Sequence, residues 1–177
     1  ATTGALNITD VETINLTNTG TAVIDATSIT GATEIATLTN TTKTTITGLE
    51  AGVAVGIGHN DTDGATAGLF DVALADATGT ADALTFNLNN TNAGNNAVEL
   101  KAAGVETVTL KQTDTTDTAL ADYTFDVDSL NASKIVVEGS KADVTNAITL
   151  TALDTDTTAV DATGFYGVLT AASGLAT

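Results

Sequence analysis

The sequence lacks five residue types that often anchor a fold or a reaction. Its 177 residues include no Cys, Met, Trp or Pro, and all five basic residues are Lys rather than Arg. The absence of Cys excludes disulfides, thiolate metal sites and cysteine nucleophiles. His59 is the single histidine, so a His-rich metal site is excluded and a hydrolytic triad would depend on this one residue.

Basic charge is also scarce. Five Lys face 22 acidic residues, which gives a formal net charge of −17. Nucleic-acid binding by phosphate neutralisation requires a basic face, so we expect no nucleic-acid partner. Anionic membrane surfaces would repel the chain, and no apolar run is long enough for membrane insertion. The chain starts at Ala1 without a charged leader, so we expect a processed N-terminus or a piece of a longer protein.

The residues that are present predict strands. Thr, Ala and Gly number 39, 30 and 16, nearly half of the chain. Thr, Val and Ile favour strands, while Asn, Asp and Gly favour turns. Short strand-like runs recur every 8 to 14 residues, for example at Ala5–Ile8, Ala83–Asn89 and Lys134–Glu138. No long run shows the apolar spacing of an amphipathic helix. Because only six side chains are aromatic, we expect an all-β protein with a thin, repetitive core of small aliphatic residues.

Internal similarity indicates how the strands are arranged. Asp10–Thr17 matches Gly104–Lys111 at a separation of 94 residues, and Ser28–Leu49 follows the order of features of Ser129–Leu150 at a separation of 101. A looser spacing of about ten residues recurs inside each copy, as stacked β-repeats give. The sequence therefore predicts a β-solenoid, a stack of short-stranded coils. The alternative is a β-sandwich of the Greek-key kind.

An Asn-rich stretch divides the two copies. Asn89–Asn96 contains five Asn residues and reads as a surface loop or a boundary. We therefore expect one β-repeat unit at residues 1–90 and a second at residues 97–177, or one continuous stack.

Several strand-like segments resemble a known class of proteins. Val11–Thr17, Val105–Leu110, Gly79–Leu88 and Ala159–Thr170 are similar to the Thr/Ala/Gly-rich β-strand repeats of bacterial surface-layer proteins and of giant adhesins exported by type I secretion. The resemblance implies an extracellular structural protein at the cell surface, often calcium-stabilised and often assembled into a lattice or fibre. The calcium-binding nonapeptide Gly-Gly-x-Gly-x-Asp of such proteins does not occur here, so its ligands cannot be transferred.

Clustered oxygen ligands nevertheless suggest calcium as a cofactor. Calcium prefers six to eight hard oxygen ligands, such as carboxylates and amide carbonyls. Three groups of residues supply them at close spacing, and an ordinary Asx turn or a solvated acidic face is the alternative for each. The predicted ligands are Asn60, Asp61 and Asp63 in the loop His59–Gly64, then Asp126 with Asp128, and Asp154 with Asp156.

The sequence offers little for catalysis. There is no Gly-x-Ser-x-Gly elbow beside His59, and sugar-cleaving solenoids usually need aromatic and basic side chains that are scarce here. We therefore expect a structural protein rather than an enzyme. It would be a subunit or repeat segment of a surface layer, fibre or large adhesin, forming a homo-oligomer or polymer, with cell-surface polysaccharide as a possible partner. A ligand-binding adhesin module and an ice-binding Thr-rich solenoid are the alternatives, the latter because of Thr-x-Thr pairs such as Thr149/Thr151.

Overall fold

The computed structural model describes residues 2–17, 20–39, 43–58, 68–89, 95–113, 122–139 and 146–172. These residues form β-strands and connecting turns, and none of them forms a helix capable of crossing a membrane. The strands are β1 (Thr2–Ala5), β2 (Ile8–Thr9), β3 (Thr13–Thr17), β4 (Ala22–Asp25), β5 (Ile29–Thr30), β6 (Glu34–Thr39), β7 (Lys43–Leu49), β8 (Ala54–Ile57), β9 (Gly68–Leu74), β10 (Ala83–Leu88), β11 (Asn95–Lys101), β12 (Thr107–Gln112), β13 (Asp122–Asp126), β14 (Lys134–Gly139), β15 (Ala147–Thr151), β16 (Ala159–Phe165) and β17 (Val168–Ala171).

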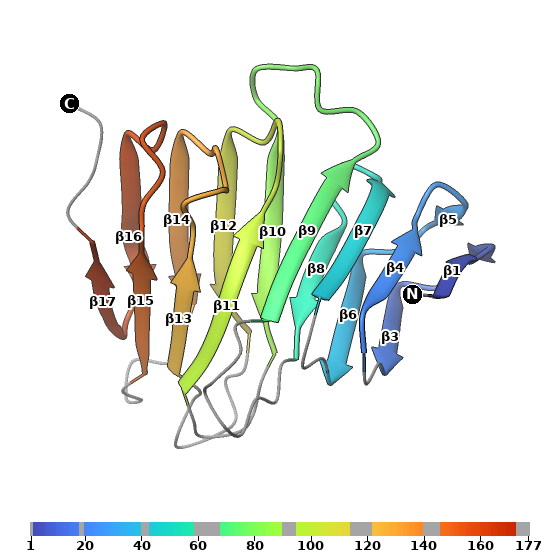
Figure 1. Cartoon of the computed structure of the whole chain (residues 1–177), viewed down its shortest axis with the longest axis horizontal. Helices are drawn as coiled ribbons and strands as arrows, with labels where there is room; N and C mark the ends of the chain where they lie inside the picture. Colours follow the sequence, from blue (N-terminus) through green and yellow to red (C-terminus); the bar gives the residue numbers. More distant parts are fainter. Residues whose placement is uncertain are drawn as a thin grey trace.

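Two parallel sheets form the two layers of the molecule (Figure 1). The long sheet has the order β1-β4-β7-β9-β11-β13-β15-β17, and the short sheet has the order β3-β6-β8-β10-β12-β14-β16. From β7 on, each strand of the long sheet except the last is followed along the chain by a strand of the short sheet. β1 and β4 are followed first by β2 and β5, which pair with each other as a separate two-stranded parallel sheet. The backbone thus winds as a coil. The predicted β-solenoid is confirmed. The Greek-key sandwich is excluded, because its strands would pair antiparallel.

The coils differ in length. In the short sheet Glu34 lies opposite Ala54, 20 residues on, whereas Val55 lies opposite Phe86, 31 residues on. The first two coils carry three strands each and the later complete coils carry two, so the ten-residue spacing of the sequence corresponds to single strands. The sequence repeat at a separation of 94 residues relates equivalent positions of the fold, since Thr13 and Thr107 each begin a strand of the short sheet.

Both sheets continue past the Asn-rich stretch that was predicted as a boundary. Before it lie β9 and β10, after it lie β11 and β12, and β9 pairs with β11 while β10 pairs with β12. Residues 90–94 of this stretch lie outside the described residues. The described strands of the two predicted units thus belong to the same pair of sheets.

The core is a narrow layer of packed side chains between the two sheets. Alternate residues of each strand point inward, and in-register pairing stacks them into columns. One column of the short sheet runs through Ile35, Val55, Phe86, Leu110 and Val137, all of which are buried. Four of the six aromatic side chains are fully buried, at Phe70, Phe86, Tyr123 and Phe125. The few large side chains therefore fill the middle of the stack, and small aliphatic residues fill the rest.

Candidate functional site

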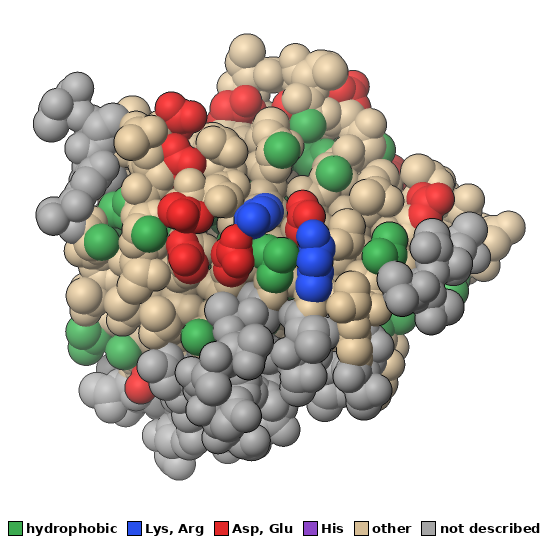
Figure 2. Space-filling view, viewed as in Figure 1, with side chains coloured by type: hydrophobic (Ala, Val, Ile, Leu, Met, Phe, Trp, Pro, Cys, Tyr) green, Lys and Arg blue, Asp and Glu red, His purple; other side chains and the backbone are tan. Residues whose placement is uncertain are grey.

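The outward face of the long sheet carries a band of charged residues. Strand alternation turns Asp71 of β9 and Lys101 of β11 away from the core, and in-register pairing places them side by side. Glu99 lies two residues before Lys101 on the same face of β11, and in-register pairing places it beside Asp126 of β13. Figure 2 shows the Lys side chains of this face set among acidic ones over the middle of the sheet.

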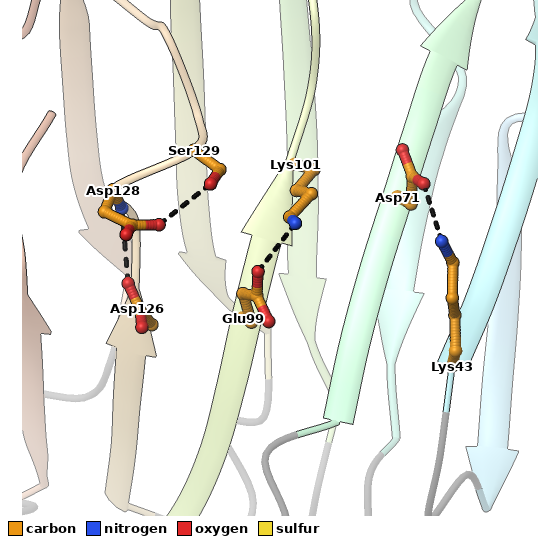
Figure 3. Close-up of polar contacts among 7 residues, drawn as sticks. All are labelled: Lys43, Asp71, Glu99, Lys101, Asp126, Asp128 and Ser129. Carbon is orange, nitrogen blue, oxygen red and sulfur yellow. Dashed lines mark hydrogen bonds and ion pairs between the residues drawn. The ribbon is translucent and has the colours of Figure 1, made fainter.

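Two close ion pairs neutralise the cations of this band (Figure 3). Lys43 Nζ lies 2.9 Å from Asp71 Oδ2 on the neighbouring strand, and Lys101 Nζ lies 2.9 Å from Glu99 Oε1 on its own strand. The hydrogen bond and charge of Glu99, with smaller contributions from Asp71 and Asp128, raise the pKa of Lys101. Exposed pairs of this kind contribute little to stability, because solvent screens them.

Asp126 and Asp128, two of the predicted calcium ligands, lie where β13 ends. The backbone N–H of Asp128 donates to Asp126 Oδ1 at 3.3 Å, which is the geometry of an Asx turn. The hydroxyl of Ser129 donates to Asp128 Oδ1 at 2.9 Å. Both carboxylates reach the solvent-facing side of the sheet, and in each the turn uses the Oδ1 atom (Figure 3).

Asp154 and Asp156 form the second predicted pair, and here the inner carboxylate serves the fold. Asp154 is only 8% exposed, and its Oδ1 accepts the backbone N–H of Asp156 at 2.8 Å. Its Oδ2 accepts the side-chain amide of Asn131, on the preceding coil, at 3.2 Å. Asp154 therefore ties two coils together. Asp156 is exposed at the tip of the same turn.

The described residues do not bring the predicted ligands into one cluster. Asn60, Asp61 and Asp63 lie in residues 59–67, outside the described part of the chain. Within the described part, no three acidic or His side chains converge as a metal site would require. Asp126/Asp128 and Asp154/Asp156 are two separate turns. Calcium binding by any of the three groups stays a prediction.

Sequence reasoning missed a recurring turn that uses a different acidic motif. The tripeptide Asp-Ala-Thr begins at Asp25, Asp76 and Asp161. In each copy the Asp Oδ1 accepts both the backbone N–H and the hydroxyl of the Thr two residues on, with hydroxyl distances of 2.6, 2.7 and 2.8 Å. These bonds stabilise the ionised carboxylate, so the pKa values of all three Asp residues are lowered.

Asp161 shows the largest of these shifts. Its carboxylate accepts the Thr163 hydroxyl and also contacts Lys134 Nζ at 3.1 Å across β14 and β16. The Thr163 hydroxyl bond, followed by the bond from Lys134, lowers the pKa of Asp161 to about 2. The repeated tripeptide was the sequence signal that could have identified this turn.

A second missed feature is a polar bridge on the outer face of the short sheet. Glu34 of β6 accepts the side-chain amides of Asn89 at 2.5 Å and Asn87 at 3.0 Å, both on the β10 segment. The carboxylate crosses the intervening strand β8 at Gly56, where an added Cβ would collide with Glu34 Oε1. Thr113 extends the bridge by a hydroxyl bond to Asn89 Oδ1. The bridge thus spans β6, β8, β10 and the end of β12.

Threonine side chains bond one coil to the next. The residue just before a strand of the short sheet donates its hydroxyl to a backbone carbonyl of the preceding coil in three places: Thr33 to Glu12 at 2.9 Å, Ser133 to Glu106 at 3.1 Å, and Thr158 to Ser133 at 3.1 Å. Thr157 and Thr151 make similar bonds to Ala132 and Phe125. These hydroxyl groups therefore connect coils rather than lie free on the surface.

The Thr-x-Thr pairs do not form a regular two-column array. Thr124, Thr149 and Thr170 stack on successive strands of the long sheet. The second column is interrupted, since Thr151 lies opposite Asp126. An ice-binding surface needs flat, regular Thr rows, and no observation here favours it.

Comparisons with family models, curated proteins and solved structures give no match for the chain. The fold places the protein in the class of parallel β-solenoids. Its function has to be argued from the residues themselves.

Proposed function

We propose that this chain is an extracellular structural protein, a subunit or repeat segment of a surface layer, fibre or large adhesin. The observation that supports this most is the use of its polar side chains. Thr33, Ser133 and Thr158 bond carbonyls of the preceding coil, and Glu34 and Asp154 connect coils through Asn amides. These groups stiffen the stack instead of converging on a substrate.

The mechanical role follows from parallel stacking. In the described part of the two large sheets, every strand between the two ends pairs with a strand on each side, so its backbone groups are satisfied along the axis of the stack. Pulling or bending the stack must break whole ladders of hydrogen bonds. A solenoid of this kind is a stiff spacer, which suits a surface layer or the stalk of an adhesin.

Calcium is the proposed stabilising ion. The chain carries a net charge of −17. Acidic side chains of successive coils repel one another, because they lie only one strand spacing apart. Three of the five Lys residues already make ion pairs, at Lys43, Lys101 and Lys134. A divalent cation at the exposed turns, such as Asp126/Asp128, would relieve the remaining repulsion. The resemblance to calcium-stabilised surface proteins agrees with this role.

Thermal unfolding tests the calcium mechanism. Melting followed by circular dichroism is measured in millimolar calcium and in excess EGTA, at fixed ionic strength. We expect calcium to raise the melting temperature of the wild-type chain. The shift should shrink in Asp61→Asn/Asp63→Asn or in Asp126→Asn/Asp128→Asn, whichever site is used.

The matched control is Asp25→Asn/Asp76→Asn. It removes the same two charges from turns whose carboxylates already bond Thr27 and Thr78, so its calcium shift should equal that of the wild type. Identical melting curves with and without calcium would refute calcium stabilisation. A shift of equal size in all variants would reduce it to general charge screening.

A further inference from the structure

The short sheet is paired least between β8 and β10, in the interior of the stack (Figure 1). In the described chain β8 is the shortest strand of this sheet, with four residues. It pairs with β10 over residues 55–57 only, so three positions are in register. The next two steps of the sheet, from β10 to β12 and from β12 to β14, pair over six positions each. Backbone pairing therefore holds β8 to β10 less firmly than it holds the strands that follow.

The long sheet is firmly paired at the same level of the stack. Strands β7 and β9 precede β8 and β10 along the chain, and both have seven residues. Their pairing runs from Lys43 opposite Leu69 to Leu49 opposite Leu74. The ion pair between Lys43 and Asp71 joins the same two strands on the outer face. The boundary between these two coils is thus held well on one side and poorly on the other, so the stack should bend here with the long sheet as the pivot.

The Glu34 bridge crosses this boundary on the weakly paired side. Its carboxylate starts from β6, passes over β8 at Gly56 and accepts the side-chain amides of Asn87 and Asn89 on the β10 segment. Ala36 and Gly56 lie on the outward face of the sheet, yet both are buried, because the bridge covers them. The bridge therefore ties β6 to β10 without using the backbone of β8.

The bonds of the bridge are oriented and charge-assisted. A carboxylate that accepts two N–H groups makes stronger hydrogen bonds than a neutral acceptor does. Thr113, just after β12, donates its hydroxyl to Asn89 Oδ1. This bond holds the Asn89 amide in the orientation that turns its Nδ2 toward Glu34.

We propose that Glu34, Asn87, Asn89 and Thr113 form a clasp that keeps the short sheet closed between β8 and β10. With the clasp in place, the described coils behave as one stiff body. When Glu34 releases the two amides, β10 separates from β8 before other strands separate, and the stack bends about β7 and β9. The clasp thus sets both the stiffness of the stack at this boundary and the place where opening begins.

Hydrogen exchange followed by mass spectrometry locates such an opening, because amides exchange when their strands separate. The clasp segments are residues 54–58 and 86–89. The reference segments are residues 107–112 and 134–139 in the same sheet and residues 43–49 in the long sheet. All samples contain excess EGTA, so the outcome does not depend on the calcium mechanism of the proposed function.

Three variants test the clasp. Glu34→Ala removes it, and Glu34→Gln keeps the length of the side chain but removes its charge. The matched control is Glu138→Ala, which removes a carboxylate from the outward face of β14. Within the described chain the Glu138 side chain makes no hydrogen bond or ion pair, so this variant breaks no tie between coils. Circular dichroism confirms that each variant is folded.

We expect Glu34→Ala to speed exchange of the clasp segments by about tenfold, since it removes two hydrogen bonds to a charged group. The reference segments should keep their wild-type rates, Glu34→Gln should lie between, and Glu138→Ala should change none of the segments. Equal acceleration of all segments would overturn the proposal, because it would indicate a global loss of stability. Unchanged exchange of the clasp segments would overturn it as well. If Glu34→Ala does not fold, the same criteria are applied to Glu34→Gln alone.

Discussion

Gln112 should be a destabilising residue that a single substitution can correct. It is the last residue of β12, points inward and is 2% exposed. Neither its Nε2 nor its Oε1 atom has a hydrogen-bond partner. The residues in register with it are Leu88, which is fully buried, and Gly139. An amide thus occupies a position that the preceding coil fills with an aliphatic side chain.

The magnitude follows from the cost of the unpaired amide. Each buried polar group without a partner costs about 1–3 kcal/mol, and an apolar replacement of similar shape removes that cost. Gln112→Met keeps the length of the side chain and removes both polar atoms. We expect the free energy of unfolding to rise by about 2 kcal/mol. For a chain of this size that corresponds to a rise of about 4–8 °C in melting temperature.

The assay is thermal and guanidinium unfolding at pH 7. Gln112→Glu buries a charge with the same shape and should lower the melting temperature strongly. Lys111→Met makes the neighbouring change on the exposed outer face and should shift stability by less than about 0.5 kcal/mol. A fall in melting temperature for Gln112→Met would refute the reasoning, because it would mean that the amide is satisfied in solution, for example by buried water.

Two further predictions concern the acidic side chains. The folded-state pKa values of Asp25, Asp76 and Asp161 lie below the ordinary value of 3.8, at about 2 for Asp161. Each carboxylate therefore contributes stability above its unfolded pKa and loses it as the pH falls through its lower folded pKa, which is about 2 for Asp161. Melting temperatures between pH 5 and 2 should decline less steeply in Asp161→Asn than in the wild type. Gly56→Ala should displace Glu34 from Asn87 and Asn89, and the added Cβ would also meet Ala36 Cβ. Unfolding of the single and double variants should give a non-additive Gly56→Ala/Glu34→Ala cycle with a coupling of about 0.5–3 kcal/mol. Additive losses would show that Gly56→Ala does not act through the bridge.

Strand positions were predictable from local pattern. The sequence predicted strands at Ala83–Asn89 and Lys134–Glu138, and the structure has β10 at Ala83–Leu88 and β14 at Lys134–Gly139. Alternation of apolar and polar residues is a local property, so it survives in any stacking arrangement. The N-terminal prediction of Ala5–Ile8 was misplaced, because that segment is the corner between β1 and β2.

Contacts between coils could not be predicted, because coil length is irregular. Glu34 bonds Asn89, 55 residues away, and no local pattern encodes a separation that depends on two coils of different length. The calcium prediction for the acidic pairs stays untested, and the sequence could not decide it for another reason. An Asx turn and a calcium loop both place carboxylate oxygens beside the backbone, so their sequence patterns coincide. Asp154 shows the consequence, since its carboxylate is used by Asn131 and by its own turn.

The composition and the proposed structural role have a common physical basis. Thr hydroxyls bond the preceding coil at Thr33 and Thr158, and in the described part of the two large sheets every strand between the ends has a strand on each side. The outer faces carry acidic residues, and like charge opposes contact between two stacks side by side. Calcium should therefore join stacks sideways only when the acidic faces are largely neutralised.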